Sequence, residues 1–216
     1  MPKPYRIVYE DDSIIVVDKP SGLLVIPTPK KEKNTLTDIL NQDLDERMIE
    51  PNAYPCHRID RETSGLVVYA KGKSIQRLMM DEFRNRNVKK AYTAFVQGII
   101  KKNFDTIKGS VYNRNKSRPE HAVTGYKVLE RRRNFTVVEV EPVTGRTNQI
   151  RIQFKGIGHP LVGESVYAFR KDFKLRFKRV ALHAKYIEFT HPVTKKRASY
   201  SSPLASDMEN FLKTRG

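Results

Sequence analysis

Apolar residues along this chain recur more often with the period of a strand than with that of a helix. Short apolar or alternating runs predict strands at residues 14–17, 66–70, 89–98, 123–130, 135–142 and 181–190. Helical spacing predicts helices at 35–44, 74–86 and 203–212, the first with a Thr35 cap and the last with Pro203 in its first turn. Because strands outnumber helices and come in adjacent pairs, we expect an α+β fold: a largely antiparallel, mixed β-sheet with flanking helices.

The segments between these elements predict turns and no separate domain. Residues 101–120 are polar and punctuated by glycine, which favours a surface hairpin or long loop, and the basic residues 131–134 read as a hairpin turn. A chain of 216 residues can form one sizeable core or two small linked ones. In the absence of repeats, low-complexity tracts and long linkers, we expect residues 1–216 to be a single catalytic domain with two lobes.

The large positive net charge of the chain suggests what kind of partner it binds. Lysine and arginine number 41 against 24 acidic residues, giving a net charge of +17 and a pI of about 9.9. Such an excess is easiest to explain if the usual partner is a polyanion, with nucleic acid the leading candidate. An anionic membrane is the alternative, but the basic amphipathic helix or lipidation signal that it usually needs is not found. With no signal peptide or membrane-spanning run evident, we expect a cytoplasmic protein and no membrane partner.

The sulfur and imidazole groups do not suggest a metal. Cys56 is the single cysteine, so it forms no disulfide within the chain, in agreement with a reducing compartment. Its neighbour His57 makes a catalytic thiol conceivable, but residues adjacent in sequence usually point apart, and a plain, partly buried cysteine is the simpler interpretation. The five histidines lack metal-ligand spacing. We therefore expect neither a metal nor a cofactor.

The stretch His57-Arg58-Ile59-Asp60-Arg61-Glu62-Thr63-Ser64-Gly65 is the first candidate for chemistry. It places one carboxylate, Asp60, between two arginines in a turn-like segment just before a predicted strand. Two nearby cations would favour the ionised carboxylate, which suits a nucleophile or an electrostatic stabiliser better than a general acid. The alternative is a surface cluster of ion pairs without chemistry.

A second polar cluster covers residues 143–153 and continues into the glycine-rich run 156–164. Thr144-Gly145 suits a tight turn, after which Ile150 and Phe154 could face the core while Arg146, Asn148 and Arg151 face elsewhere. The run Gly158-His159-Pro160-Leu161-Val162-Gly163 has too many glycines and apolar residues for an ordinary solvated loop. It is typical of backbone packed closely under a site.

These segments together resemble the RluA-type pseudouridine synthases, which isomerise specific uridines in structured RNA. The matching pieces are residues 57–66, Lys90-Ala91-Tyr92, residues 144–152, residues 158–163 and Leu182-His183-Ala184, in the order of that family. The resemblance runs from about Ile14 to Thr190. It implies the family's two-lobed catalytic fold with a central cleft. Few residues precede the first predicted strand, so we expect no N-terminal accessory RNA-binding domain, and recognition would use the basic surface of the catalytic domain.

The resemblance also implies roles for individual residues. Asp60 would be the catalytic aspartate, Arg151 the arginine that pairs with it, and Tyr92 the tyrosine that stacks on the target base. The residues expected to bind substrate are Arg58, which would fill the space that the base leaves, Leu182, which would wall the uracil pocket, and Arg61, Thr63, Arg146 and Asn148. Asn148 departs from the histidine common in the family, which suggests a changed contact to RNA or to supporting residues rather than lost activity.

The reaction that this implies needs no external nucleophile, because the uracil leaves C1′ through nitrogen and rejoins it through carbon. The expected partner is RNA, with ribosomal and transfer RNA stem-loops both open, and no obligate protein partner is inferred. Other interpretations stay open for single residues: Tyr92 could be an ordinary strand tyrosine, and Arg146 and Arg151 could bind phosphate alone. The whole chain could also be a non-catalytic RNA-binding or ribosome-assembly module, or an RNA nuclease.

Overall fold

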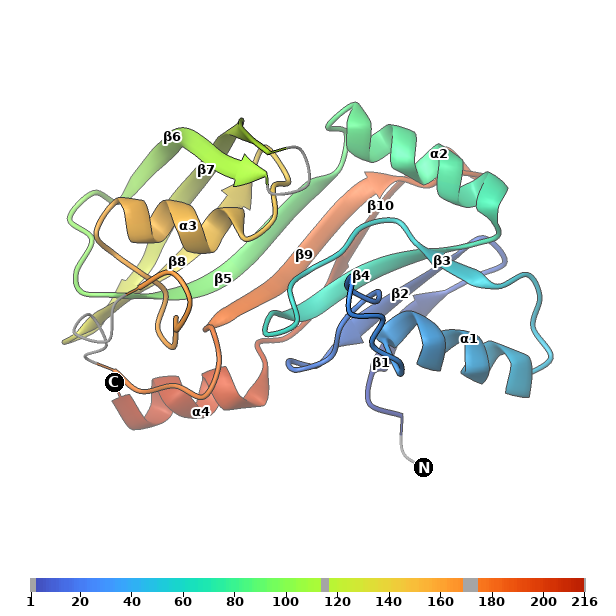
Figure 1. Cartoon of the computed structure of the whole chain (residues 1–216), viewed down its shortest axis with the longest axis horizontal. Helices are drawn as coiled ribbons and strands as arrows, with labels where there is room; N and C mark the ends of the chain where they lie inside the picture. Colours follow the sequence, from blue (N-terminus) through green and yellow to red (C-terminus); the bar gives the residue numbers. More distant parts are fainter. Residues whose placement is uncertain (1–2, 114–116, 169–174, 216) are drawn as a thin grey trace. The chain divides into compact units, whose positions relative to one another are not determined.

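The computed structural model describes residues 3–113, 117–168 and 175–215, and the chain divides into two compact units (Figure 1). The first unit comprises residues 1–89 and 184–203, and the second comprises 90–183 and 204–216. In their described parts, both units combine antiparallel strands with two helices. The predicted α+β class and the largely antiparallel pairing are therefore confirmed, whereas the central cleft stays a prediction.

The strands of the first unit follow the order β1-β2-β4-β9, with β3 beside β4 and β10 beside β9. Neighbours β1 and β2, β2 and β4, and β9 and β10 pair antiparallel. The register of β2 on β4 runs from Ile14 opposite Ala70 to Lys19 opposite Gly65. The strands are β1 (Arg6–Glu10), β2 (Ile14–Lys19), β3 (Ala53–Pro55), β4 (Ser64–Lys71), β9 (Leu182–Thr190) and β10 (Arg197–Ser201).

Helices cover both faces of β2 and β4, which is why every residue of β4 is buried. On one face, Met79 of α2 (Lys73–Arg84) joins a core with alternate residues of the two strands. On the other, α1 (Leu36–Glu46) lies close to Tyr69, whose hydroxyl is 3.1 Å from that of Thr37. The predicted Thr35 cap is confirmed, as a capping box with Asp38.

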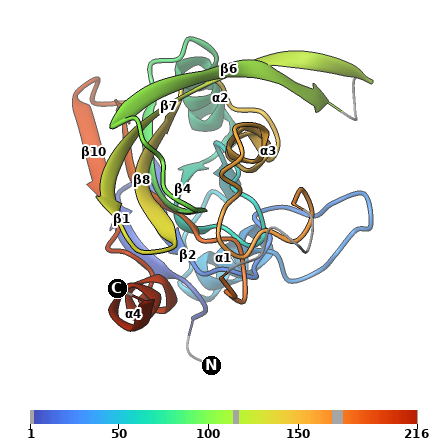
Figure 2. The ribbon, with the colours of Figure 1, turned by 90° about the vertical axis from the view of Figure 1, so that its left-hand side faces the viewer.

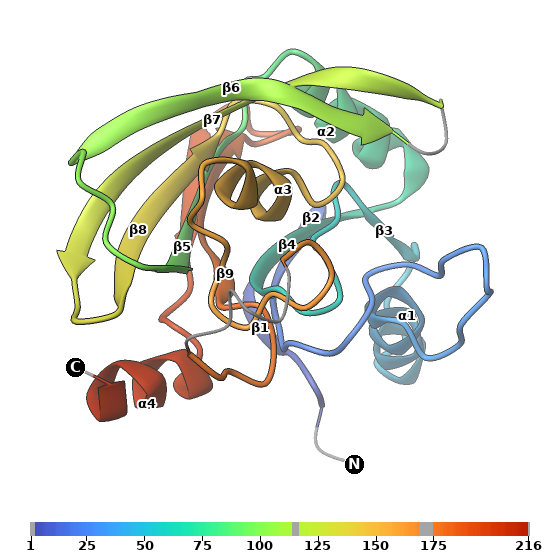
Figure 3. The same cartoon turned by 60° about the vertical axis from the view of Figure 1, so that its left-hand side comes forward.

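The second unit is a four-stranded antiparallel sheet of order β5-β8-β7-β6 with one helix packed on each face (Figures 2 and 3). Helix α3 contributes Ile150 and Phe154 to one core, and α4 contributes Met208 and Phe211 to the core on the other face. The elements are β5 (Lys89–Gln97), β6 (Phe104–Asn113), β7 (Arg118–Arg131), β8 (Phe135–Pro142), α3 (Gln149–Gly156) and α4 (Ser206–Arg215).

The structure confirms the predicted strands and both N-terminal helices. In the described part of segment 101–120, β6 and the first residues of β7 form an antiparallel pair, in agreement with the predicted hairpin. Helix α3 and the short strands β1, β3 and β10 were not predicted. The predicted start of the last helix is wrong: Pro203 precedes the helix and belongs to no helix or strand, and α4 begins at Ser206. In the described residues, no helix has the length and apolar character needed to cross a membrane.

Candidate active site

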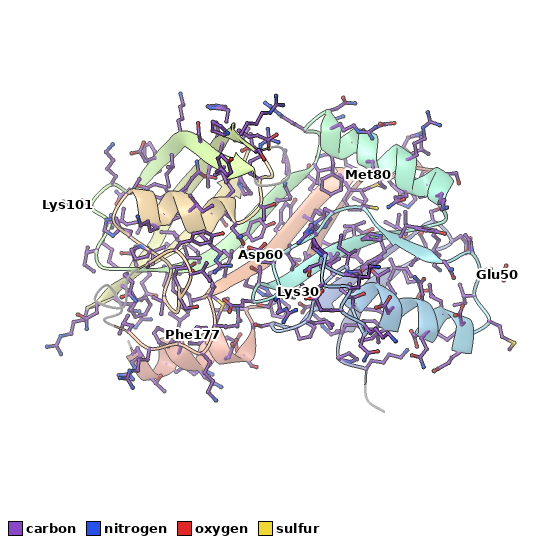
Figure 4. All side chains as sticks on the ribbon, viewed as in Figure 1. Lys30, Glu50, Asp60, Met80, Lys101 and Phe177 are labelled. Carbon is purple, nitrogen blue, oxygen red and sulfur yellow. The ribbon has the colours of Figure 1, made fainter. Side chains whose placement is uncertain are left out.

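Asp60 lies in a tight turn of the first unit that leads directly into β4 (labelled in Figure 4). The turn is closed by a hydrogen bond in which the Thr63 N–H donates to the Asp60 carbonyl over 3.1 Å. The Asp60 side chain is half-buried, while its neighbour Ile59 is buried and Arg58 is exposed. The chain thus anchors this turn through the buried Ile59, while Asp60 stays only half-buried.

A buried lysine fixes the backbone of the Asp60 turn. Lys19 is fully buried at the end of β2, and its ammonium group donates to the carbonyls of Leu23 and Arg61 at 2.7 and 3.1 Å. The Ser21 hydroxyl adds a hydrogen bond of 2.9 Å to the Glu62 carbonyl. A buried ammonium group is tolerated only when such acceptors replace its water. Sequence reasoning missed Lys19, because an isolated lysine at the end of a predicted strand does not reveal its bond to the distant Arg61 carbonyl.

The remaining predicted residues of this turn differ in their surroundings. The Thr63 side chain is buried, with 1% of its surface exposed, so it contributes to the packing of the turn. Arg61 pairs with Glu32, with 3.2 Å between Nη2 and Oε1. That exposed pair contributes little to stability, because water screens it. Substrate binding by Arg58, Arg61 and Thr63 stays a prediction.

Gly65 explains why the turn can enter β4 so close to β9. Its backbone has a φ of +109°, and a Cβ atom placed there would lie 2.3 Å from the Ala184 carbonyl oxygen. Residues other than glycine rarely adopt such a φ, and no side-chain rearrangement removes a clash with backbone. The motif therefore requires glycine at this position for a steric reason.

Cys56 and His57 are structural. The His57 Nε2 atom accepts a hydrogen bond of 3.1 Å from the Val68 N–H, and its ring packs on Phe83. Cys56 is 2% exposed, and burial raises the pKa of its thiol to about 12. The thiol is therefore protonated and unreactive at neutral pH.

We expect the native protein to resist alkylation at Cys56 by iodoacetamide at pH 7.5, and Cys56→Ala to keep the activity of the wild type. Mass spectrometry of the intact protein measures the labelling, with urea-unfolded protein as the reactive control. Rapid stoichiometric labelling of the folded protein would show that the thiol is accessible, contrary to its burial.

In the second unit, Gln149 organises the turn that leads into α3. Its Oε1 atom accepts from the Thr144 hydroxyl at 2.7 Å and from the Arg146 N–H at 3.0 Å. Its Nε2 group donates to the Val123 carbonyl and to the Thr124 hydroxyl of β7. Gln149 is 3% exposed, so this buried amide is fully paired. The turn and the first residues of α3 are thus fixed to the sheet.

Arg151 follows in the first turn of α3 and is buried. Its Nε and Nη2 atoms donate to the two carboxylate oxygens of Glu164, each over 2.8 Å, and Nη1 donates to Asn148 Oδ1 over 3.2 Å. Burial alone would raise the pKa of Glu164, but hydrogen bonds from Arg151 and the Val166 N–H and the arginine charge hold that pKa below its usual value. Sequence reasoning assigned no role to Glu164, the last residue of the glycine-rich run 156–164.

The other predicted residues of the second unit divide between surface and core. The Arg146 guanidinium contacts Glu120 at 3.3 Å and the His121 carbonyl at 3.3 Å. Leu182 is 3% exposed and belongs to the core cluster against which Tyr92 packs. The structure thus brings Arg151 together with Asn148, and it packs Tyr92 against the core cluster that contains Leu182. The pairing of Asp60 with Arg151, and the base contacts of Tyr92 and Leu182, stay predictions.

Only the second half of the glycine-rich run is packed closely against backbone: Gly156 and Gly158 have open space around them, whereas Pro160, Leu161 and Val162 are buried. Gly163 has a φ of +81°, and a Cβ atom there would lie 1.9 Å from the Arg179 carbonyl oxygen. The Val162 N–H donates to the Phe95 carbonyl, and the Val162 carbonyl accepts from the Ala181 N–H. This packing places Glu164 directly after a segment with little freedom to move. In the described parts of the chain, histidine, cysteine and acidic side chains form no group of three or more suited to a metal.

A family model, related sequences and a solved structure all indicate the same family or fold for this chain. Residues 13–155 match the family model of RNA pseudouridylate synthases. An uncharacterized RNA pseudouridine synthase of Bacillus subtilis, YlyB, is 36% identical over 98% of this chain and 73% of its own length. The ribosomal large subunit pseudouridine synthase D of Pseudomonas aeruginosa is 36% identical over 94% of this chain and 69% of its own length. The solved structure of human RNA pseudouridylate synthase domain containing 4 shares the fold, with a TM-score of 0.81 at 22% identity over 96% of this chain and 92% of its own.

Proposed function

The chain belongs to the RNA pseudouridylate synthase family, and we propose that it isomerises uridines in ribosomal or transfer RNA of the cytoplasm by chemistry that depends on Asp60. Its activity is that of an RNA pseudouridine synthase. The observation that best supports the role of Asp60 is its turn, whose backbone is fixed by Lys19 while Asp60 itself is only half-buried. A fixed carboxylate is what an attack on a sugar carbon requires.

The proposed reaction is balanced without any other reactant. The bond between C1′ of ribose and N1 of uracil breaks, and its electron pair leaves with the base. The Asp60 carboxylate either bonds to the sugar or stabilises its electron-poor state, and Arg151 orients that carboxylate. The uracil turns in place and C5 bonds to C1′, and any bond between C1′ and the Asp60 carboxylate breaks in the same step. The proton on C5 is released and N1 takes up one proton, so the product is an isomer of the substrate. The covalent route consumes the negative charge of Asp60. The electrostatic route keeps that charge, which compensates the positive charge that develops on the sugar.

The target uridine must leave its base stack before Asp60 can reach the sugar. Extruding a base costs a few kcal/mol, which phosphate contacts can offset. We propose that Tyr92 stacks on the extruded base, a contact worth about 1 to 3 kcal/mol per base in single-strand binders. Arg58, which is exposed in the Asp60 turn, would occupy the space that the base leaves.

Part of the basic surface is a groove in the second unit. It has a volume of about 500 Å³ and is lined by Lys101, Lys102 and Lys108 together with the carboxylate Asp105. Lys102 pairs with Asp105 over 2.7 Å, which leaves the exposed Lys101 and Lys108 as the better candidates for phosphate contacts. The net charge of the groove suits the RNA backbone.

If Lys101 and Lys108 each neutralise one phosphate, the double substitution to glutamine should weaken RNA binding. The slope of log K against log salt should then fall by about 1.4 to 1.8. The matched control is Lys196→Gln with Lys213→Gln, which changes the net charge equally at two separate exposed positions. Equal effects of the two pairs on the salt slope would mean that the groove makes no specific contact.

A pseudouridine synthase, an RNA-binding module and a nuclease would each leave the RNA in a different state. Carbodiimide-stop sequencing of RNA incubated with the protein should reveal new pseudouridines at defined uridines, in RNA that remains full-length. An RNA-binding or ribosome-assembly module would give neither modification nor cleavage, and a nuclease would give shortened RNA. An unmodified pool of ribosomal and transfer RNA would contradict the proposed substrates.

A further inference from the structure

The Glu164 side chain is held in place by hydrogen bonds from nearby backbone N–H groups, in addition to its contacts with other side chains. Its Oε1 atom accepts from the N–H groups of Val166 and Tyr167 at 2.9 and 3.2 Å, and its own N–H donates to the Leu161 carbonyl. Its side chain has no exposed surface. A carboxylate held in this way presents both oxygens in one orientation, which suits bidentate binding of an arginine.

Asn148 and Tyr167 complete the seat of Arg151. The Asn148 amide accepts from Arg151 and donates to the Tyr167 hydroxyl over 2.7 Å, and the guanidinium carbon lies 5.2 Å from the centre of the Tyr167 ring. Asn148 has a φ of +55°, a conformation that asparagine tolerates better than most residues. These three residues, Glu164, Asn148 and Tyr167, are called the seat of Arg151. Glu164 and Asn148 bind the N–H groups at the edge of the guanidinium, and the Tyr167 ring packs on its face.

The charge of the buried Arg151 is already balanced by one carboxylate, that of Glu164, so the two further partners need another explanation. A buried ion pair often stabilises a fold no better than apolar residues of the same volume, so its orienting effect is the property that calls for an explanation. In the proposed reaction the negative charge of Asp60 is consumed if the carboxylate bonds to the sugar. A second carboxylate on Arg151 keeps the guanidinium paired and in place through that step.

We propose that Glu164 is a positioning residue of the isomerase, which holds Arg151 in the orientation that Asp60 requires, with Asn148 and Tyr167 as its supports. This inference rests on the proposed role of Arg151. It also gives Asn148 a role in this chain as a support of the arginine.

Glu164→Gln tests the proposal, because it keeps the size of the side chain and removes its charge. The measurement is the single-turnover rate constant of pseudouridine formation with saturating enzyme in excess, which does not depend on the folded fraction as long as folded enzyme saturates the RNA. A misplacement of about 1 Å in a catalytic group can cost about 100-fold, and we expect a loss of that order with the RNA dissociation constant changed less than threefold.

Asp207→Asn is the matched control. Asp207 also forms a bidentate pair in the second unit, with the buried Arg179, at 2.7 and 2.8 Å. It should lower the melting temperature and leave the rate constant within twofold of the wild type. A rate constant for Glu164→Gln within twofold of the wild type, or an equal loss in Asp207→Asn, would overturn the proposal.

Asn148→Gly keeps the test valid if Glu164→Gln does not fold. Glycine accepts the left-handed backbone and removes only the amide. Loss of one hydrogen bond to a charged group should lower the rate constant about tenfold with unchanged RNA affinity. Weaker RNA binding at an unchanged rate constant would instead make Asn148 an RNA contact and refute the seat. If the wild type modifies no RNA, the proposed function fails, whatever these variants do.

Discussion

Asp60→Asn should abolish pseudouridine formation while RNA affinity falls less than tenfold. The amide keeps the shape of the side chain but supplies no negative charge to the sugar, whereas binding depends mainly on phosphate contacts made elsewhere. We expect a loss of at least about 1000-fold, the range seen when a group that acts directly on the transition state is removed. Release of tritium from RNA labelled at uridine C5 measures the rate, because C5 loses its hydrogen when it bonds to the sugar.

Asp12→Asn is the control for this result. Asp12 is an exposed carboxylate of the same unit, so the substitution makes the same change of charge outside the Asp60 turn. It should leave both rate and affinity near those of the wild type. Turnover of Asp60→Asn close to the wild-type rate would remove Asp60 from the chemistry, and a parallel loss of RNA binding would make it a binding residue.

Gly65→Ala should destabilise the first unit severely. A backbone conformation reserved for glycine costs about 1 to 3 kcal/mol when another residue is forced into it. The Cβ atom would also lie 2.3 Å from the Ala184 carbonyl oxygen, so β4 and β9 must separate. We expect a total above about 4 kcal/mol, the size found only for severe structural faults. In a chain of this length that lowers the melting temperature by more than about 8 °C.

Two other glycines separate the causes of this loss. Gly22 has a φ of +90° with no atom within 4 Å of its Cβ position, so Gly22→Ala measures the backbone strain alone. Gly109, in β6, has equally open space and no positive φ, so alanine there should be neutral or slightly stabilising. Chemical denaturation of the three variants gives the comparison. If Gly65→Ala costs no more than Gly22→Ala, the close approach of Ala184 is not what makes glycine necessary.

The elements that were predicted are those whose local pattern agrees with their tertiary surroundings. Residues 14–17 and 66–70 are continuous apolar runs, and both lie in strands buried on two faces. Helix α3 was missed because Ile150, Ile152 and Phe154 follow each other at the spacing of a strand. Its helical form depends on contacts distant in sequence, such as those of the Gln149 amide with β7. Pro203 is compatible with a first helical turn but does not determine where the helix starts.

The same distinction holds for the candidate site. Asp60, Arg151 and Tyr92 could be proposed as site residues because they stand in compact motifs, and their roles stay predictions. Lys19 and Glu164 could not be proposed in this way, although each is fully buried and holds a predicted site residue or its turn in place. An isolated lysine or glutamate has no sequence pattern that identifies its partner. Supporting residues of this kind become visible only when the fold brings the partners together.

A structure of the protein bound to its target RNA tests the central claim most directly, through the distances from the Asp60 carboxylate. We predict an extruded uridine whose C1′ atom lies about 3 to 3.5 Å from a carboxylate oxygen, the separation of groups poised to react. The second oxygen should be within hydrogen-bond distance of the Arg151 guanidinium. A bound uridine whose sugar lies out of reach of Asp60, or a carboxylate turned away from Arg151, would contradict the account.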